Sequence, residues 1–417
     1  MAGARPLQFI VVRIAFAENR FPLFRAMLYP PHMTSLARVR EILHRLCSFD
    51  TTSRDSNLPL IEWVEDFLKP LGAHVVRVPS EDGKKSNLWA RLGPDVPGGI
   101  VLSGHTDVVP VDGQPWVTDP FDMIATEDKW FARGTTDMKG FIALSLAHAE
   151  AISKIPLKVP VHFAFSYDEE IGCAGVEPMI AEIGRRGAAP SVVWVGEPTL
   201  WGVLSAHKGI RDYEIRITGK DAHSSDPRLG ASAIHEAIDL LAVLRKIARE
   251  QEDNAPMNSE FDPSWTTITV GEIGGGTAPN ILARECRFVF DVRTVPGVNP
   301  DAMLAPFFAE VARVNEKLAK LGPGCGVVVD LRADAPPLQL QRDSAAETFM
   351  RALTGDNQIR VAAFATEAGQ FQKAGFPAVI CGPGSVAQAH QPNEFVAISE
   401  MQKGVEVFAR FLETLRG

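Results

Sequence analysis

Histidine and carboxylate side chains stand directly after apolar stretches of this chain, where they could bind a metal ion. His105 and Asp107 follow the apolar stretch 99–103, which is typical of a buried strand. Residues two apart on a strand project to one side, so one can bind a metal while the other holds the second ring nitrogen. A lone histidine is more often no ligand, and that alternative stays open for this pair alone.

Asp137 lies in the segment 133–140, where Gly134 and Gly140 flank it. Two glycines so close together favour a tight, unusual backbone, as functional loops often have. The alternative is that Asp137 caps the N-terminus of a helix expected over 138–154, because aspartate is a preferred capping residue.

Three adjacent carboxylates, Asp168, Glu169 and Glu170, follow the strand expected over 159–166. Because like charges repel one another, a solvated turn is one interpretation. The other is one metal ligand beside one general base, which would take a proton from a metal-activated water and give it to a leaving amine.

Two further candidates follow strands, Glu197 after 191–196 and His390 after 378–381. Imidazoles and carboxylates are the ligands of catalytic zinc, and a ligand shared by two metals should be a carboxylate, which has two oxygens. Each candidate is weak singly, but together they predict a metal cluster at the strand ends of one sheet. The five predicted ligands are His105, Asp137, Glu170, Glu197 and His390.

Strands alternate with helices on both sides of residues 211–331, which indicates a sheet flanked by helices, with ligands beyond the strand ends. Between them the order is β-α-β-β-α-β, the ferredoxin-like motif. We therefore expect an α/β catalytic domain over 34–210 and 332–417, with an inserted α+β lid domain over 211–331. Residues 1–33 are expected to be an irregular extension.

Composition narrows the function further. The net charge of −9 disfavours nucleic acid as a partner, and no apolar run is long enough to span a membrane. Five cysteines scattered singly indicate thiols in a reducing compartment, so we expect a cytoplasmic protein. The apolar stretch 7–17 contains Arg13, which argues against a signal peptide; a mis-assigned start before Met33 is the alternative. No Gly-x-Ser-x-Gly elbow of a serine hydrolase is present.

From about Thr34 onward, these motifs resemble the acetylornithine deacetylase, succinyl-diaminopimelate desuccinylase and aminoacylase family of two-zinc metallopeptidases (M20). The resemblance implies a zinc-exopeptidase-like catalytic domain and two divalent metals, Zn²⁺ first and Co²⁺ as the alternative. His105, Asp137 and Glu197 would hold one metal, and Asp137, Glu170 and His390 the other. Asp107 would orient His105, Glu169 would be the general base, and a cis peptide would follow Asp137.

The resemblance also implies substrate-binding roles in and near the lid. His223 would polarise the scissile carbonyl, in dimeric members from the partner subunit, while Asn280 and Arg293 would clasp the substrate carboxylate. Glu367 would meet the side-chain amine of ornithine. The alternatives are a surface loop for His223, a strand-end surface charge for Arg293 and a helix-start carboxylate for Glu367.

The segments 104–116, 133–140 and 389–394 resemble the acetylornithine deacetylase branch most. The resemblance implies hydrolysis of N2-acetyl-L-ornithine to L-ornithine and acetate, a step of arginine biosynthesis, by a homodimer joined through the lid. The alternatives are a deacylase, desuccinylase or dipeptidase acting on another small N-acyl amino acid, and an inactive metal-binding homologue.

Overall fold

The computed structural model describes residues 34–416. The expectations for residues 1–33, an irregular extension, a signal peptide or a mis-assigned start, lie outside the described residues. No helix within 34–416 is long and apolar enough to cross a bilayer.

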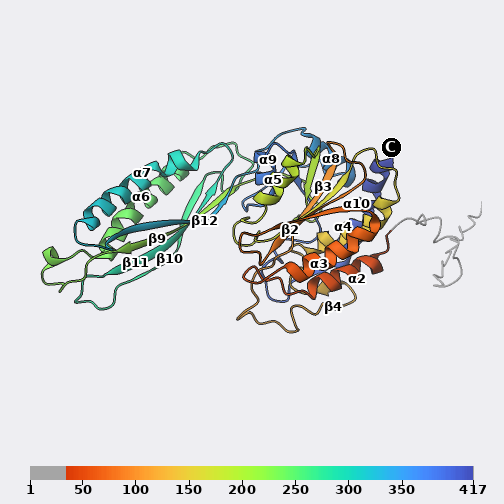
Figure 1. Cartoon of the computed structure of the whole chain (residues 1–417). Coiled ribbons are helices and arrows are strands. Elements are labelled where there is room, and N and C mark those ends of the chain that lie inside the picture. The colour runs from red at the N-terminus through yellow and green to blue at the C-terminus, as the bar shows by residue number, and fades with distance from the viewer. Residues whose placement is uncertain (1–33, 417) are drawn as a thin grey trace, which may run out of the picture. The chain divides into compact units, whose positions relative to one another are not determined.

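The first domain contains an eight-stranded mixed sheet (Figure 1). Its inner strands β6, β3, β7 and β14 run parallel, whereas β1, β2 and β8 join antiparallel. In sheet order the strands are β1 (His74–Pro79), β2 (Ser86–Leu92), β6 (Val161–Ser166), β3 (Ile100–His105), β7 (Val192–Val195), β14 (Ala378–Ile380), β8 (Leu204–His207) and β13 (Arg360–Ala362). A mixed sheet confirms the predicted α/β class.

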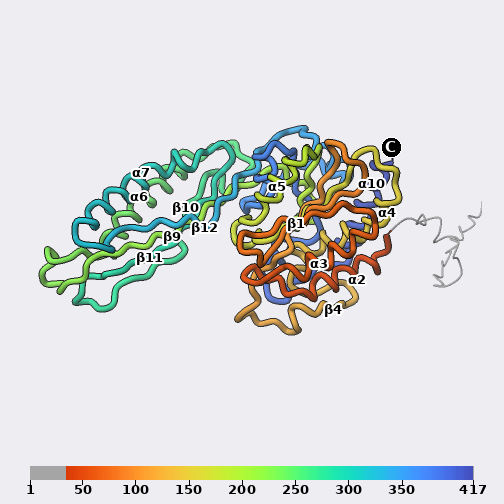
Figure 2. Tube along the Cα trace, in the orientation of Figure 1, coloured from red at the N-terminus to blue at the C-terminus, as the bar shows by residue number. Residues whose placement is uncertain are grey.

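Helices cover both faces of this sheet, and β7 shows how. Val193 and Val195 belong to the apolar cluster formed with α5 (Glu177–Arg185) and α9 (Ala368–Lys373). Trp194 between them points the other way, because side chains alternate along a strand, and it stacks on Phe408 of α10 (Ile398–Arg416). The last helix thus returns the C-terminal part of the chain to the first domain, beside α2 (Leu36–Cys47) and α4 (Lys139–Ser153) (Figure 2).

The spacing of apolar residues explains these helices. In α2, Val39, Ile42, Leu43 and Leu46 fall on one helical face and are buried, and the hydroxyl of Ser35 caps the first turn. The remaining helices of this domain are α3 (Leu58–Leu68), the short η1 (Lys69–Leu71) and α8 (Ala345–Thr354).

A small three-stranded sheet accompanies the main sheet in this domain. Its strand order is β15 (Phe395–Ala397), β5 (Lys129–Phe131) and β4 (Ile124–Ala125). It joins the chain before Asp137 to the chain after His390. The prediction that every candidate ligand follows a strand of one sheet was therefore wrong for Asp137, which follows β5. His105 is itself the last residue of β3, because that strand runs two residues further than expected.

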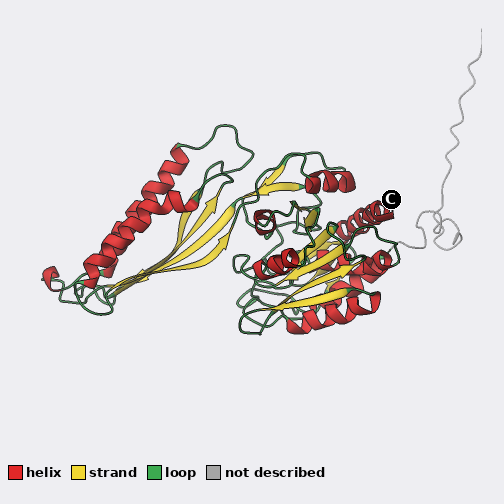
Figure 3. Ribbon diagram, turned by 45° about the horizontal axis from the view of Figure 1, so that its top comes forward, coloured by secondary structure: helices red, strands yellow, loops and turns green. Residues whose placement is uncertain are grey.

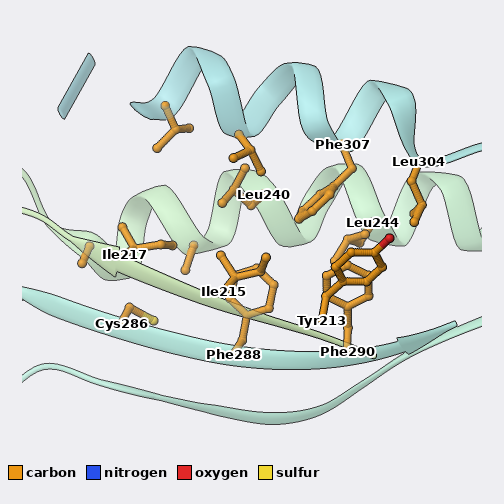
Figure 4. Packing of buried hydrophobic residues seen from close by; sticks show 14 of the residues in the cluster. Tyr213, Ile215, Ile217, Leu240, Leu244, Cys286, Phe288, Phe290, Leu304 and Phe307 are labelled. Atoms are coloured by element: carbon orange, nitrogen blue, oxygen red, sulfur yellow. The ribbon is translucent and has the colours of Figure 1, made fainter. Parts of the chain in front are cut away.

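The inserted domain has the predicted β-α-β-β-α-β order. Figure 3 shows its long helices on one side of its sheet. Its antiparallel sheet runs β10 (Thr267–Gly275), β11 (Glu285–Thr294), β9 (Gly209–Thr218) and β12 (Gly326–Ala335). The helices α6 (Ala233–Asp253) and α7 (Pro300–Ala319) pack on one face, where Phe288 and Phe290 meet Leu240 and Phe307 (Figure 4). A short η2 (Pro227–Leu229) precedes α6. The ferredoxin-like lid fold is confirmed, whereas the exact domain boundaries stay predictions.

Candidate metal centre

Asp137 lies between two imidazoles. Its Oδ1 is 3.0 Å from Nε2 of His105, and its Oδ2 is 3.3 Å from Nε2 of His390. The two oxygens of one carboxylate thus face two different histidines, one from β3 and one from the loop after β14. This is the arrangement that a carboxylate shared by two metals requires.

The other two predicted ligands complete the cluster. Glu170 Oε2 is 2.9 Å from His390 Nε2, and Glu197 Oε1 is 3.9 Å from His105 Nε2. Glu197 is buried, and its Oε1 has no hydrogen-bond partner among the described residues. One ligand atom each of His105, Asp137 and Glu170 lie within 4.8 Å of one another. All five side chains therefore meet at one place, although their roles as ligands stay predictions.

The structure does not fit the two alternative interpretations of the acidic residues, a helix cap for Asp137 and a solvated turn for residues 168–170. The N-cap of α4 is Met138 without a side-chain hydrogen bond, so Asp137 does not cap that helix. The expected cis peptide between Asp137 and Met138 is present. The Asp168–Glu170 segment is no freely solvated turn either, since Asp168 pairs with Lys85 and the side chain of Glu170 is only 5% exposed.

Asp107 organises both sides of this centre. Nδ1 of His105 lies 3.0 Å from the backbone carbonyl of Asp107 and 3.6 Å from its carboxylate, so the carbonyl is the nearer partner. If Nδ1–H donates to this carbonyl, Nε2 is left free for a metal. The Asp107 carboxylate instead accepts from the hydroxyl of Ser53 at 2.7 Å and from the N–H groups of Glu169 and Glu170 at 3.2 Å.

The cluster carries an excess of buried negative charge. Burial raises the pKa of Glu169 to about 7 and that of Glu170 to about 8, and nearby Asp137 adds to both shifts. Burial and Asp137 also raise the pKa of Glu197 well above its usual value. Hydrogen bonds to Asp137 and Glu170 raise the pKa of His390 to about 10. Bound cations would relieve this repulsion among carboxylates.

A cavity of about 270 Å³ opens onto the centre. Glu169 lines it, and the thiol of Cys173 donates to Glu169 Oε1 at 3.4 Å. The lining residues are Asp137, Glu169, Glu170, Gly172, Cys173, Glu197, Pro198, Ile210, Arg293, Phe364, Ala365, Val386, Ala389 and His390. The predicted base and four of the predicted ligands therefore face the space in which a substrate would bind.

The four predicted substrate-binding residues are placed differently. Arg293 lines the cavity, and its Nε donates to Asp291 at 2.7 Å. In the described chain, His223 and Asn280 do not line it. They are exposed neighbours in the lid, where the N–H of Ser224 donates to the carbonyl of Asn280.

Glu367 is 1% exposed and is not part of the cavity wall formed by the described residues. It stands at the start of α9 without a capping hydrogen bond from its side chain. Burial raises the pKa of Glu367 to about 7, partly offset by the hydroxyl of Ser166. Contact with a substrate amine stays a prediction for this residue.

Comparison with known proteins decides the family, because residues 101–414 match Peptidase family M20/M25/M40. The chain belongs to this family. Acetylornithine deacetylase of Proteus mirabilis is 33% identical over 369 residues, 87% of this chain and 92% of that protein. That of Myxococcus xanthus is 33% identical over 383 residues, 90% and 97% of the two chains. The enzyme is therefore a metal-dependent amidohydrolase.

Similarity to a Yersinia pestis acetylornithine deacetylase covers 94% of this chain at 31% identity. The uncovered part is shorter than 33 residues, so the likeness to the family begins before Thr34, contrary to the expectation from the motifs.

Solved structures of other hydrolases share the fold, and one of them is described as an M20 metallo-carboxypeptidase. The metallo-carboxypeptidase Sso-CP2 from Sulfolobus solfataricus superposes with a TM-score of 0.72 at 18% identity, over 91% of this chain and 99% of that one. Aminopeptidase PepT from Bacillus cereus superposes with a TM-score of 0.69 at 17% identity, over 93% and 100% of the two chains.

Several residues around this M20 centre were given no role from sequence. Glu394 is 0% exposed and accepts hydrogen bonds from the loop that carries Asp137. Ser53 and Gln114 also contact the loops of the centre. Glu394 stood in a segment typical of the family, but its partners lie 257 or more residues away, and Ser53 had no local signal.

Proposed function

We propose that the chain hydrolyses N2-acetyl-L-ornithine to L-ornithine and acetate with two divalent metals, in the first place Zn²⁺. The observation that carries the two-metal proposal is the Asp137 carboxylate, whose two oxygens face His105 and His390. The substrate rests on the acetylornithine deacetylases that are 31–33% identical to this chain.

The residues fit a pair of metal ions. Two imidazoles and three carboxylates converge, and the buried Glu197 Oε1 has no hydrogen-bond partner among the described residues. His105 and Glu197 would hold one ion, Glu170 and His390 the other, and Asp137 both. Metals bound here would polarise the amide carbonyl and make water more acidic.

Glu169 would move the proton. A carboxyl group whose burial raises the pKa to about 7 can accept a proton from water and release it again near neutral pH. Hydroxide adds to the acetyl carbon, the C–N bond breaks, and the proton held by Glu169 passes to the leaving nitrogen. Arg293, in the cavity wall, would bind the carboxylate of the substrate through its planar fork of donors.

We assign His223 and Asn280 to the site of a second chain. Both are exposed and neighbouring in the lid, and neither lines the cavity of the described chain. A homodimer joined through the lid would bring them to the partner's cavity, where His223 would stabilise the oxyanion.

Five free cysteines fit a reducing, cytoplasmic setting.

Mixing two inactive variants tests this exchange. In a mixed dimer of Glu169→Gln and His223→Ala chains, one site would keep both an intact base and an intact histidine. Recovery of activity on mixing would support the assignment. No recovery, with mixed dimers verified by differently tagged chains, would contradict it.

A second candidate substrate class is an N-acetyl amino acid with an apolar side chain. Outside the metal cluster, Glu169 and Arg293, the cavity wall of the described chain consists of uncharged residues such as Ile210, Phe364 and Val386. A cationic side chain would find no further carboxylate there, because Glu367 is 1% exposed and does not line the cavity.

Steady-state rates on a small panel separate these candidates. The panel contains N2-acetyl-L-ornithine, N-acetyl-L-leucine, an N-succinyl amino acid and a dipeptide. We expect kcat/KM to be highest for acetylornithine, by about tenfold or more. A preference of that size for acetyl-leucine would overturn the ornithine assignment and support the apolar class.

A further inference from the structure

Glu394 forms a buried anchor for the loop that carries Asp137. Its Oε1 accepts from the N–H groups of Thr136 at 2.8 Å and Asp137 at 3.1 Å. Its Oε2 accepts from the N–H of Gly134 at 3.0 Å and from Nη1 of Arg133 at 2.8 Å. One carboxylate thus accepts four hydrogen bonds from four residues of the segment 133–137.

The same network reaches the loop of His390. Arg133 donates through Nη2 to Oε1 of Gln114 at 2.7 Å, and Nε2 of Gln114 donates to the backbone carbonyl of His390 at 3.0 Å. The ring of Trp116 packs over the guanidinium of Arg133 and donates to the same Gln114 oxygen. The loops before Asp137 and around His390 are therefore connected by side chains that are not among the five proposed ligands.

The backbone of this second loop needs such support. His390 has a φ of 63°, and Asn393 one of 56°, a region that non-glycine residues occupy at an energetic cost. Asn393 is held by the N–H of Val117, which donates to its Oδ1 at 2.8 Å. Contacts from residues 114–117 therefore stabilise the conformation that directs His390 toward Glu170.

We propose that Glu394 is a positioning residue: through Arg133 and Gln114 it fixes the distance between Asp137 and His390. It thereby sets the affinity for the second metal, the ion that Asp137, Glu170 and His390 would hold. The inference rests on the proposed two-metal function. Partners behind the ligands of a metal typically change its affinity by about 10- to 100-fold when replaced.

Glu394→Gln is a sharp test because it keeps the shape. Each carboxylate oxygen faces two donors, so either orientation of the amide would point an NH₂ group at donors. The matched control is Glu347→Gln on α8, away from the centre. Glu347 is also buried and accepts from Arg351, Ser205 and a backbone N–H.

The measurement is metal titration of the full chain with Zn²⁺, together with the visible spectrum of the Co²⁺-loaded protein. We expect Glu394→Gln to lower the affinity for the second metal by about 10- to 100-fold and to change the visible spectrum of the Co²⁺-loaded protein. Glu347→Gln should lose thermal stability but keep both metal constants and the spectrum. Wild-type metal constants in Glu394→Gln would overturn the inference.

A milder variant covers the case in which Glu394→Gln does not fold. Gln114→Ala, at a partly exposed position, removes the two hydrogen bonds that connect Arg133 to the backbone carbonyl of His390, while Arg133 keeps its pair with Glu394 and its bond to the carbonyl of Gln391. A lower affinity for the second metal in this variant supports the inference, and unchanged metal dissociation constants overturn it. A wild-type chain that binds fewer than two metals would instead contradict the proposed function itself.

Discussion

The carboxylate of Asp107 accepts a hydrogen bond from the backbone N–H of Glu169 at 3.2 Å. The residue whose carbonyl contacts His105, a proposed metal ligand, therefore also holds the segment that carries the proposed base. From sequence we expected Asp107 only to orient His105, not to hold the segment of Glu169. Two functions of the centre, metal binding and proton transfer, share one support.

Replacing this support should harm both functions. In Asp107→Asn, an NH₂ group replaces one of the two oxygens that accept from Ser53, Glu169 and Glu170, so one side of the side chain would point a donor at donors and the segment 168–170 should shift. We expect metal affinity and kcat each to fall by about 10- to 100-fold. Metal titration and steady-state rates check this. Ser53→Ala removes one of these bonds and should give a smaller loss; unchanged values in Asp107→Asn would contradict the shared role.

Asp137→Asn tests the shared ligand. An amide is a poorer metal ligand than a carboxylate, and it has no pair of anionic oxygens to share between the two metal ions that we propose beside His105 and His390. We expect fewer than two metals per chain, measured by elemental analysis after gel filtration. We also expect loss of turnover, measured as the steady-state rate. Asp122→Asn, at an exposed position, is the control. Full occupancy of two metals in Asp137→Asn would argue against a bridge.

Arg293→Met tests recognition of the substrate carboxylate. The guanidinium lines the cavity and donates to Asp291, so under the proposed role its loss would remove a charged hydrogen bond that is made both before and during the reaction. KM should rise by about tenfold to hundredfold with little change in kcat. Arg284→Met on the exposed lid surface is the control. A fall in kcat at unchanged KM would assign Arg293 another role.

Buried His148 should make folding stability depend on pH away from the metal centre. It stacks on Phe408, and burial lowers its pKa to about 4, whereas an unfolded histidine titrates near 6.5. Between these values the unfolded chain binds a proton that the folded chain does not, so stability falls as the pH falls from about 6.5 to 4.

Denaturant unfolding of His148→Gln at several pH values measures this effect. The variant should reduce the slope of stability against pH in that window by up to about 1.4 kcal/mol per pH unit, the equivalent of one proton. His44→Gln, at an exposed position of α2, removes a histidine elsewhere and serves as the control. An unchanged slope in His148→Gln would show that this residue does not set it.

Long, regular elements could be predicted from sequence. The helix expected over 138–154 is α4, and the strands expected over 159–166 and 191–196 are β6 and β7, each within two residues of the expected bounds, because their apolar residues must be buried. The three-residue strands β5 and β15 were missed. Each is too short for a period, and they are stabilised by a partner more than 250 residues away.

The site shows the same division. Residue types at strand ends indicated His105, Glu170 and Glu197, because neighbouring parallel strands deliver their ends to one edge. The position of Glu367 could not be derived, since only packing of α9 decides whether a helix-start carboxylate faces the cavity or the interior. Glu394 was out of reach for a related reason: its donors come from a loop 257–261 residues away.

Glu169→Gln tests the central claim most directly, because the substitution removes the proton acceptor and keeps the shape and all five proposed ligands. The measurement pairs metal content with the turnover number for the best substrate of the panel. We expect two metals per chain, as in the wild type, and a kcat lower by about 10²- to 10⁴-fold. A variant that keeps its metals and still turns over at the wild-type rate would contradict Glu169 as the base.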